Sequence, residues 1–338
     1  MSEIKTLENK DKIVLSVKNL QTKFHVGKGL VHAVNDVSFD LKCESTLGIV
    51  GESGCGKSVT ALSIMQLLPD TGFISAGSII YRDRSGKEYD ITKLRRNGSD
   101  IRRIRGKDIA VIFQDPMASL NPVYKVGDQI MENLLEHEKM NKKAARERVV
   151  DVLTELGIPD PEKRFDNYPH EFSGGMRQRV MIAIAMICNP SILIADEPTT
   201  ALDVTIQAQI LELMKETQKK LGISIILITH NMGIIAETCD EVAVMYMGKI
   251  VEFGGLEQIF NNPLHPYTQS LLMSVPVLGI SKNSELVSIK GITPDASEEF
   301  AGCAFEPRCD HVRKACKEIP PNRIVYDDGH QVQCWLYS

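Results

Sequence analysis

The sequence predicts an α/β fold in which helices cover both faces of a mostly parallel sheet. The apolar run Leu47–Val50 is typical of a buried strand; a glycine-rich loop follows it, and the run from Val59 to Leu68 has helical character. A second alternation of strand-like and helix-like runs extends from Ile192 to Val251. Strands separated by helices favour parallel pairing, because crossover helices then lie on the faces of the sheet.

The composition is that of an ordinary globular protein. The chain has 338 residues, of which 43% are apolar and 25% charged, and a formal net charge of −5, which argues against a general nucleic-acid-binding protein. No apolar stretch approaches the ~20 residues of a membrane span. The polar segment from Met1 to Lys12 lacks the apolar centre of a signal peptide. We therefore expect the chain to lie in the cytoplasm, where disulfides are rare.

The glycine-rich loop carries the first chemical signal. Residues Gly51–Ser58 match G-x-x-x-x-G-K-S, in which backbone N–H groups and a helix start form a concave site for phosphate. Lys57 adds a positive charge, and the Ser58 hydroxyl suits Mg²⁺. A glycine-rich turn without function is the alternative, but a chance match in such a chain is on the order of one per cent. The candidate nucleotide-binding residues are Gly51, Ser53, Gly54, Cys55, Gly56, Lys57, Ser58 and Val59.

Two further motifs complete a nucleotide site. The strand-like run from Ile192 ends in Asp196, which is placed to hold Mg²⁺, and Glu197, which is placed to polarise an attacking water. The alternative is a solvated acidic turn. The sequence Ser173-Gly174-Gly175 before an apolar helix forms a second anion site, unless Ser173 is only a helix cap. Two phosphate sites are useful if two chains face each other head to tail.

This set of motifs resembles the nucleotide-binding subunit of ABC transporters over residues 13–255. Gly51–Ser58 match the Walker A loop and Ile192–Asp196 match Walker B, with Glu197 at the position of the catalytic glutamate. Phe172–Met176 resemble the signature LSGGQ, with Phe for Leu and Met for Gln. The remaining matches are Gln114 to the Q-loop glutamine, Ala201–Asp203 to the D-loop, His230 to the switch histidine, and Phe24 (His25 second) to the aromatic residue that stacks on adenine.

The resemblance implies an ABC-type P-loop ATPase with a RecA-like core, an antiparallel β subdomain and a helical subdomain. It implies a dimer that holds two ATP molecules between Walker A of one subunit and Ser173 and Gly175 of the other, with Gly174 and Asp203 also among the nucleotide-binding residues. Glu197, His230, Gln114 and Lys57 are then the catalytic residues, and Ser58, Gln114 and Asp196 the Mg²⁺ ligands. Taken singly, Gln114, His230 and Asp203 also fit ordinary roles as a polar loop residue, a strand-end histidine and a helix cap.

The regions expected are a disordered leader (1–12), a nucleotide-binding domain (13–260) with its helical part at about 115–185, and a small cysteine-rich C-terminal extension (261–338). Gln114–Pro122 and Asn262–Thr268 resemble segments of oligopeptide and dipeptide importers, a group that includes nickel importers. Membership implies uptake of such a solute, a peripheral position on the cytoplasmic face of the cell membrane, two integral-membrane permease subunits, an extracytoplasmic solute-binding protein, and a homologous second ATPase. The alternative hypotheses are a non-transport ABC ATPase and a nucleotide-binding regulatory module that does not hydrolyse ATP.

The C-terminal extension contains Cys303, Cys309, Cys316 and Cys334, separated by five, six and seventeen residues. This spacing lacks the close C-x₂₋₄-C pairs of zinc sites. Four thiolates in a short segment suit a [4Fe–4S] cluster, and the tail resembles the extension of peptide-importer ATPases, where such a cluster is known. Zinc and free structural thiols are the alternatives, and His311 and His330 are alternative ligands.

Overall fold

The computed structural model describes residues 12–27, 29–115, 119–200, 202–274, 289–295, 298 and 300–338. Residues 1–11 of the expected leader, residues 116–118 of the expected helical region and Ala201 of the D-loop match lie outside the described residues.

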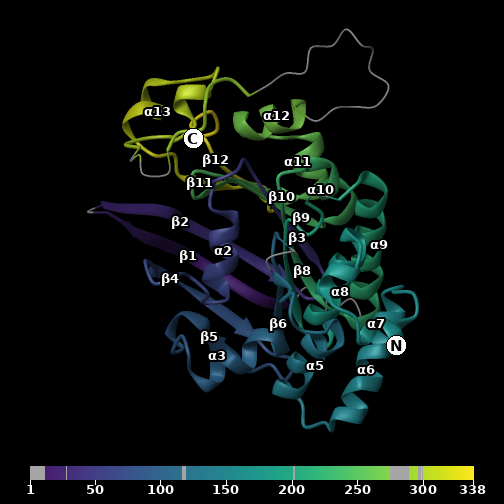
Figure 1. The fold of residues 1–338 in the computed structure, drawn as a ribbon. Helices are drawn as coiled ribbons and strands as arrows, with labels where there is room; N and C mark the ends of the chain where they lie inside the picture. Colours follow the sequence, from purple (N-terminus) through teal and green to yellow (C-terminus); the bar gives the residue numbers. More distant parts are fainter. Residues whose placement is uncertain are drawn as a thin grey trace, which may run out of the picture.

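The centre of the fold is an eight-stranded sheet with the order β11-β12-β10-β9-β3-β8-β7-β6 (Figure 1). Its strands are β3 (Thr46–Val50), β6 (Ile109–Ile112), β7 (Ile192–Asp196), β8 (Ser224–Thr229), β9 (Glu241–Tyr246), β10 (Lys249–Gly255), β11 (Arg323–Val325) and β12 (Gln331–Gln333). The pairs among β9, β3, β8, β7 and β6 are parallel, whereas β10, β12 and β11 pair antiparallel. The predicted parallel core is therefore confirmed.

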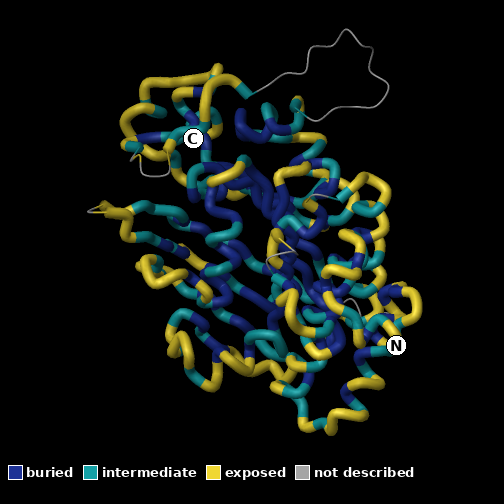
Figure 2. The backbone as a smooth tube through the Cα atoms, viewed as in Figure 1, coloured by how far each residue is buried: buried dark blue, intermediate teal, exposed yellow. Residues whose placement is uncertain are grey.

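The core strands bury side chains on both faces, as a parallel sheet between two layers requires. Along β7, Ile192 and Ile194 enter one apolar core, and Leu193 and Ala195 enter the other. This alternation follows from the two-residue period of a strand. Figure 2 shows the buried backbone running through the sheets, with exposed segments at the ends of the outer elements.

An antiparallel sheet with the order β2-β1-β4-β5 forms one covering layer. Its strands are β1 (Ile13–Val26), β2 (Gly29–Lys42), β4 (Gly72–Arg82) and β5 (Glu88–Asp90). One hairpin pairs the long strands β1 and β2 almost from end to end. Helix α2 (Lys57–Ile64) packs between this sheet and the core.

The other face is covered by helices (Figure 1). The helices of the fold after α2 are α3 (Ser99–Arg103), α5 (Val126–His137), α6 (Lys142–Glu155), α7 (Pro161–Phe165), α8 (Gly174–Met186), α9 (Val204–Leu221), α10 (Met232–Thr238), α11 (Leu256–Asn261), α12 (Pro266–Met273) and α13 (Lys314–Glu318). In α5, Val126, Ile130 and Leu134 recur every four residues and are buried together. Helices α5 and α6 lie within the region at about 115–185 that the sequence predicts to be helical.

The C-terminal extension is joined to the core sheet by backbone pairing. Strand β12 pairs with β10 through Glu252↔Val332 and Phe253↔Gln331, and β11 pairs with β12. A buried hydrogen-bond contact reinforces this edge, since His330 Nε2 lies 2.8 Å from Glu252 Oε1. No helix in the described part of the chain has the length and apolar character needed to cross a bilayer.

Candidate functional site

The phosphate loop follows β3 and leads into α2. At Gly56, φ is +103°, and a Cβ there would lie 2.3 Å from the Ala33 carbonyl oxygen. Only glycine tolerates both conditions, so the glycine at this position of the motif has a local steric reason. The buried Lys57 side chain folds back over the loop, where Nζ donates to the carbonyl oxygens of Gly51 at 2.7 Å and Glu52 at 2.9 Å.

Asp196, at the end of β7, faces Ser58 at the start of α2. Burial raises the pKa of the Asp196 carboxyl, and a hydrogen bond with Ser58 acts in the opposite direction. Its Oδ1 is buried and has no hydrogen-bond partner. A buried carboxylate oxygen without a partner next to a serine hydroxyl is a donor set that fits Mg²⁺, which prefers oxygen ligands.

The carboxylate of Glu197 has three side-chain partners in the site. Its Oε2 accepts hydrogen bonds from Gln114 Nε2 at 3.0 Å and Thr200 Oγ1 at 2.9 Å, and its Oε1 lies 3.0 Å from His230 Nδ1. Burial favours a raised pKa, but hydrogen bonds from His230 and Thr200 outweigh it, so the pKa of Glu197 is lowered. The carboxylate is thus held in its charged form, the form required to orient or deprotonate water.

The backbone at Glu197 is also unusual. Its φ is +48°, in the left-handed region that non-glycine residues seldom adopt. The Glu197 amide donates to the Ile228 carbonyl oxygen at 2.8 Å, which ties this conformation to the end of β8. Such a strained residue persists only when its surroundings determine it, and it is often found at functional sites.

The predicted residues Gln114, Glu197 and His230 therefore come together, although they are far apart in the sequence. Thr200 joins them and was missed by sequence reasoning. The available signal was its position three residues after Glu197, from which a side chain in a tight turn can reach back.

Ser173 and Asp203 both cap helices. Ser173 Oγ accepts from the Met176 amide at 3.4 Å at the start of α8, and an Asp203 carboxylate oxygen accepts from the Ile206 amide at 3.0 Å at the start of α9. Ser173 and Gly174 are exposed, so this helix start is open to a second molecule. The capping alternative is correct for both residues, and it is compatible with anion binding at the same helix start.

Phe24 lies on β1 and packs against the backbone of β4. A Cβ added to Gly72 would lie 2.6 Å from the Phe24 ring, so the absence of a side chain at Gly72 makes room for it. His25 stacks instead on Phe73, with ring centroids 5.2 Å apart. Both candidate aromatic residues thus have partners on β4, and stacking of Phe24 on adenine stays a prediction.

The four cysteines of the extension lie near one another. The Cys303 amide donates to the Cys316 carbonyl oxygen at 2.8 Å. Burial raises the pKa of the Cys303 thiol to about 11, and the thiols of Cys334, Cys316 and Cys309 act in the same direction. Among the residues described, however, no three Cys, His, Asp or Glu side chains are grouped to hold a metal ion. The alternative ligand His330 is instead paired with Glu252, and both side chains are buried.

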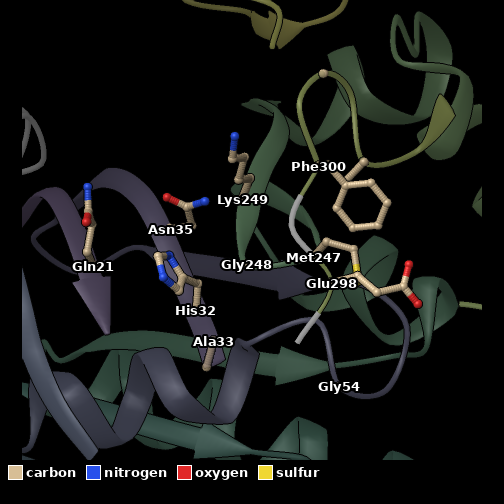
Figure 3. Close-up of a pocket in the computed structure, with 12 residues that line it drawn as sticks. Gln21, His32, Ala33, Asn35, Gly54, Met247, Gly248, Lys249, Glu298 and Phe300 are labelled. Atoms are coloured by element: carbon tan, nitrogen blue, oxygen red, sulfur yellow. The ribbon is translucent and has the colours of Figure 1, made fainter. Parts of the chain in front are cut away.

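A pocket of about 360 Å³ lies next to the phosphate loop (Figure 3). Gly54 of the loop and His32, Asn35 and Lys249 line it, and Phe300 of the C-terminal extension lies across from His32 and Asn35. The extension therefore contributes to the surroundings of the phosphate loop.

Comparison with known proteins gives two family matches. Residues 34–200 match the family model described as ABC transporter. Residues 251–316 match the one described as oligopeptide/dipeptide transporter, C-terminal region.

Curated relatives match over nearly the whole chain. The dipeptide transport ATP-binding protein DppD of Bacillus subtilis is 52% identical over 324 residues, which cover 96% of this chain and 94% of the relative. The oligopeptide transport ATP-binding protein OppD of the same organism is 50% identical and is covered to 88%. Among solved structures, cbiO1 of Clostridium perfringens, part of an ABC transporter complex, matches with a TM-score of 0.61 and 29% identity, covering 75% of this chain and 92% of that one. A dimeric bacterial ABC transporter cassette, at 23% identity and a TM-score of 0.62, shares the fold.

Proposed function

Because the chain belongs to the ABC transporter family as an ATP-hydrolysing subunit, we propose that it powers the uptake of dipeptides or oligopeptides through a membrane permease. The observation that carries the proposal is the match of residues 251–316 to the oligopeptide/dipeptide transporter C-terminal region. The names of the relatives DppD and OppD support the same substrate class. A nickel importer and a non-transport ATPase are the competing functions.

The site geometry supports a division of roles in hydrolysis. The backbone donors of Gly51 and Ser53–Ser58 and the Lys57 ammonium bind the phosphates of the substrate ATP, while Phe24 stacks on its adenine. Ser58, Asp196 and Gln114 hold Mg²⁺, which supplies charge stabilisation for phosphoryl transfer. Glu197, fixed by Gln114 and Thr200, orients the attacking water and accepts its proton. His230 contacts the transferring phosphoryl group.

A second subunit completes each site. Ser173, Gly174 and Gly175 at the exposed start of α8 contact the phosphates bound to the opposite chain, and Asp203 of the D-loop belongs to the same composite site. ATP then bridges two protomers, and hydrolysis removes the bridge, which provides a switch between closed and open dimers. The partner is a homologous ATPase, so the functional dimer is a heterodimer.

The permease contacts the helical region at about 115–170. Val123 and Tyr124 there are 72% and 58% exposed. Exposed apolar side chains of this size in a membrane-associated subunit suit docking of short cytoplasmic permease helices. The chain is then peripheral on the cytoplasmic face of the membrane, and an extracytoplasmic solute-binding protein delivers the cargo to the permease.

The cysteines of the extension hold a [4Fe–4S] cluster in this proposal. Support comes from the convergence of Cys303, Cys309, Cys316 and Cys334. One zinc ion with Zn–S bonds of about 2.3 Å would draw four sulfurs to within about 4 Å of each other. Among the described residues no three such side chains are grouped to hold a metal ion, so the metal content decides between the cluster and zinc. Iron and sulfide near four per chain in anaerobically purified protein would support the cluster, whereas stoichiometric zinc would reject it.

The transport proposal is tested by growth. A strain that requires an amino acid is supplied with that amino acid only as a dipeptide, and this chain is replaced by its Glu197→Gln variant. We expect growth on the dipeptide to cease and growth on the free amino acid to continue, while the control Thr217→Val on α9 behaves as wild type. Unchanged dipeptide uptake together with lost nickel uptake would favour the nickel importer, and no defect in either would point to a non-transport ATPase.

A further inference from the structure

The phosphate loop is tied to the C-terminal extension through Glu52, the second residue of the loop. The Arg308 guanidinium donates to both carboxylate oxygens of Glu52, with Nη1 to Oε2 at 2.6 Å and Nη2 to Oε1 at 3.0 Å. Thr293 Oγ1 adds a hydrogen bond to Oε2 at 3.1 Å. The Glu52 backbone amide donates to the Tyr267 hydroxyl of α12 at 2.9 Å. All three partners lie in the region 261–338.

Arg308 is fixed independently of Glu52. Its side chain is 4% exposed, and Nε donates to the Lys290 carbonyl oxygen at 2.8 Å. The guanidinium carbon lies 5.8 Å from the ring centroids of Tyr246 and of Phe305. A planar guanidinium held by a backbone acceptor and two aromatic rings presents its fork in one direction, which is the geometry of bidentate carboxylate binding.

The contact between Arg308 and Glu52 extends to Lys57, the lysine of the phosphate loop. Lys57 Nζ donates to the Glu52 carbonyl oxygen at 2.9 Å, so a shift of Glu52 moves an anchor of the Lys57 side chain. Although burial raises the pKa of the Glu52 carboxyl, hydrogen bonding with Arg308 outweighs it and the pKa is lowered. The pair is therefore ionised, and removing Arg308 would leave a partly buried carboxylate without its main partner at the mouth of a site that receives ATP.

We propose that Arg308 is a positioning residue for ATP binding, which holds the phosphate loop in its binding conformation through Glu52. The C-terminal extension thereby sets the ATP affinity of the core domain. Cys309 follows Arg308 directly. A structural change at the four cysteines of the extension therefore reaches the phosphate loop through Arg308 and Glu52. This role adds to the established ATPase activity and does not depend on which solute is transported.

The test compares MgATP affinity in five variants of the chain by titration with a fluorescent ATP analogue. Arg308→Met removes the fork and keeps much of the side-chain volume, and Glu52→Gln removes the charge of its partner. The double variant completes the cycle. Arg313→Met is the matched control, because Arg313 lies in the same extension and donates to the Trp335 carbonyl oxygen, away from the loop.

We expect about tenfold weaker MgATP binding in Arg308→Met and in Glu52→Gln, from the loss of a hydrogen-bonded charge pair. The double variant should bind no more weakly than the weaker single variant, and Arg313→Met should bind as wild type. The turnover number at saturating ATP should stay within about twofold, because the pair positions the loop and does not touch the reacting atoms.

Arg308→Lys, which keeps the charge but not the bidentate fork, should fall between wild type and Arg308→Met. Circular dichroism and the thermal midpoint establish which variants are folded, and Glu52→Gln carries the test if Arg308→Met is unfolded. The proposal is overturned if folded Glu52→Gln or Arg308→Met binds MgATP as tightly as Arg313→Met. It is also overturned if the two single effects simply add.

Discussion

Thr200→Val removes one of the hydrogen bonds that hold Glu197 and leaves the shape of the side chain almost unchanged. The Thr200 hydroxyl donates to Glu197 Oε2 at 2.9 Å, the same oxygen that accepts from Gln114 at 3.0 Å. A hydrogen bond to a charged group contributes up to about 3 kcal/mol, but Thr200 is exposed and water can replace it in part. We therefore expect a loss of about 1 kcal/mol in transition-state stabilisation, or about fivefold in turnover.

The pH dependence gives this prediction a second readout. In the wild type, hydrogen bonds from His230 and Thr200 lower the pKa of Glu197 against the effect of burial. Without Thr200 the carboxylate is less stabilised, so its pKa rises and the acidic limb of the pH–rate profile moves to higher pH.

The assay is steady-state ATP hydrolysis from pH 5 to 9, with MgATP affinity measured on the same samples. Thr217→Val is the matched control, because the Thr217 hydroxyl only donates to the Leu213 carbonyl oxygen within α9. An unchanged turnover number and acidic limb in Thr200→Val would refute the idea that Thr200 orients Glu197, as would a defect confined to ATP affinity.

Three further predictions concern binding and stability. Lys57→Ala should weaken MgATP binding by at least about tenfold in a direct titration, because it removes the positive charge proposed to bind the phosphates. Burial lowers the pKa of His265 to about 3 in the folded chain, whereas the residue has its ordinary pKa of 6.5 in the unfolded chain. Below pH 6.5 the unfolded chain therefore binds more protons than the folded chain. The free energy of unfolding should then fall by about 1 kcal/mol between pH 7 and 5.5 from this residue alone, and His265→Asn should remove that part in denaturant titrations. Phe305→Ala should cost about 3–5 kcal/mol in the same titrations, since the ring is 2% exposed and packs against Tyr246 at 5.2 Å and Tyr267 at 5.3 Å.

The sequence was sufficient to predict those parts of the site that consist of short continuous motifs. The phosphate loop, the acidic end of β7 and the helix start at Ser173 each combine backbone geometry and side chains within a few residues, so their spacing alone is informative. The parallel core was predictable for a similar reason, because buried strands such as β7 and β8 are continuous apolar runs.

Contacts between distant segments could not be predicted in this way. Glu52 and Arg308 are 256 positions apart, and no local period or spacing relates them. The pairing of β12 with β10 is equally non-local, and β12 is only three residues long. Thr200 was within reach of a local argument, but its hydroxyl meets Glu197 only because Glu197 adopts a positive φ, which the sequence does not reveal.

We propose that Glu197 turns a phosphate-binding fold into an ATPase, and the Glu197→Gln variant is the sharpest test of this role. Turnover and MgATP binding are measured on the same purified chain, with Thr217→Val alongside. We expect ATP binding within about twofold of wild type and a loss of hydrolysis by at least about a hundredfold, as for removal of a general base. Hydrolysis at the wild-type rate in this variant would contradict it.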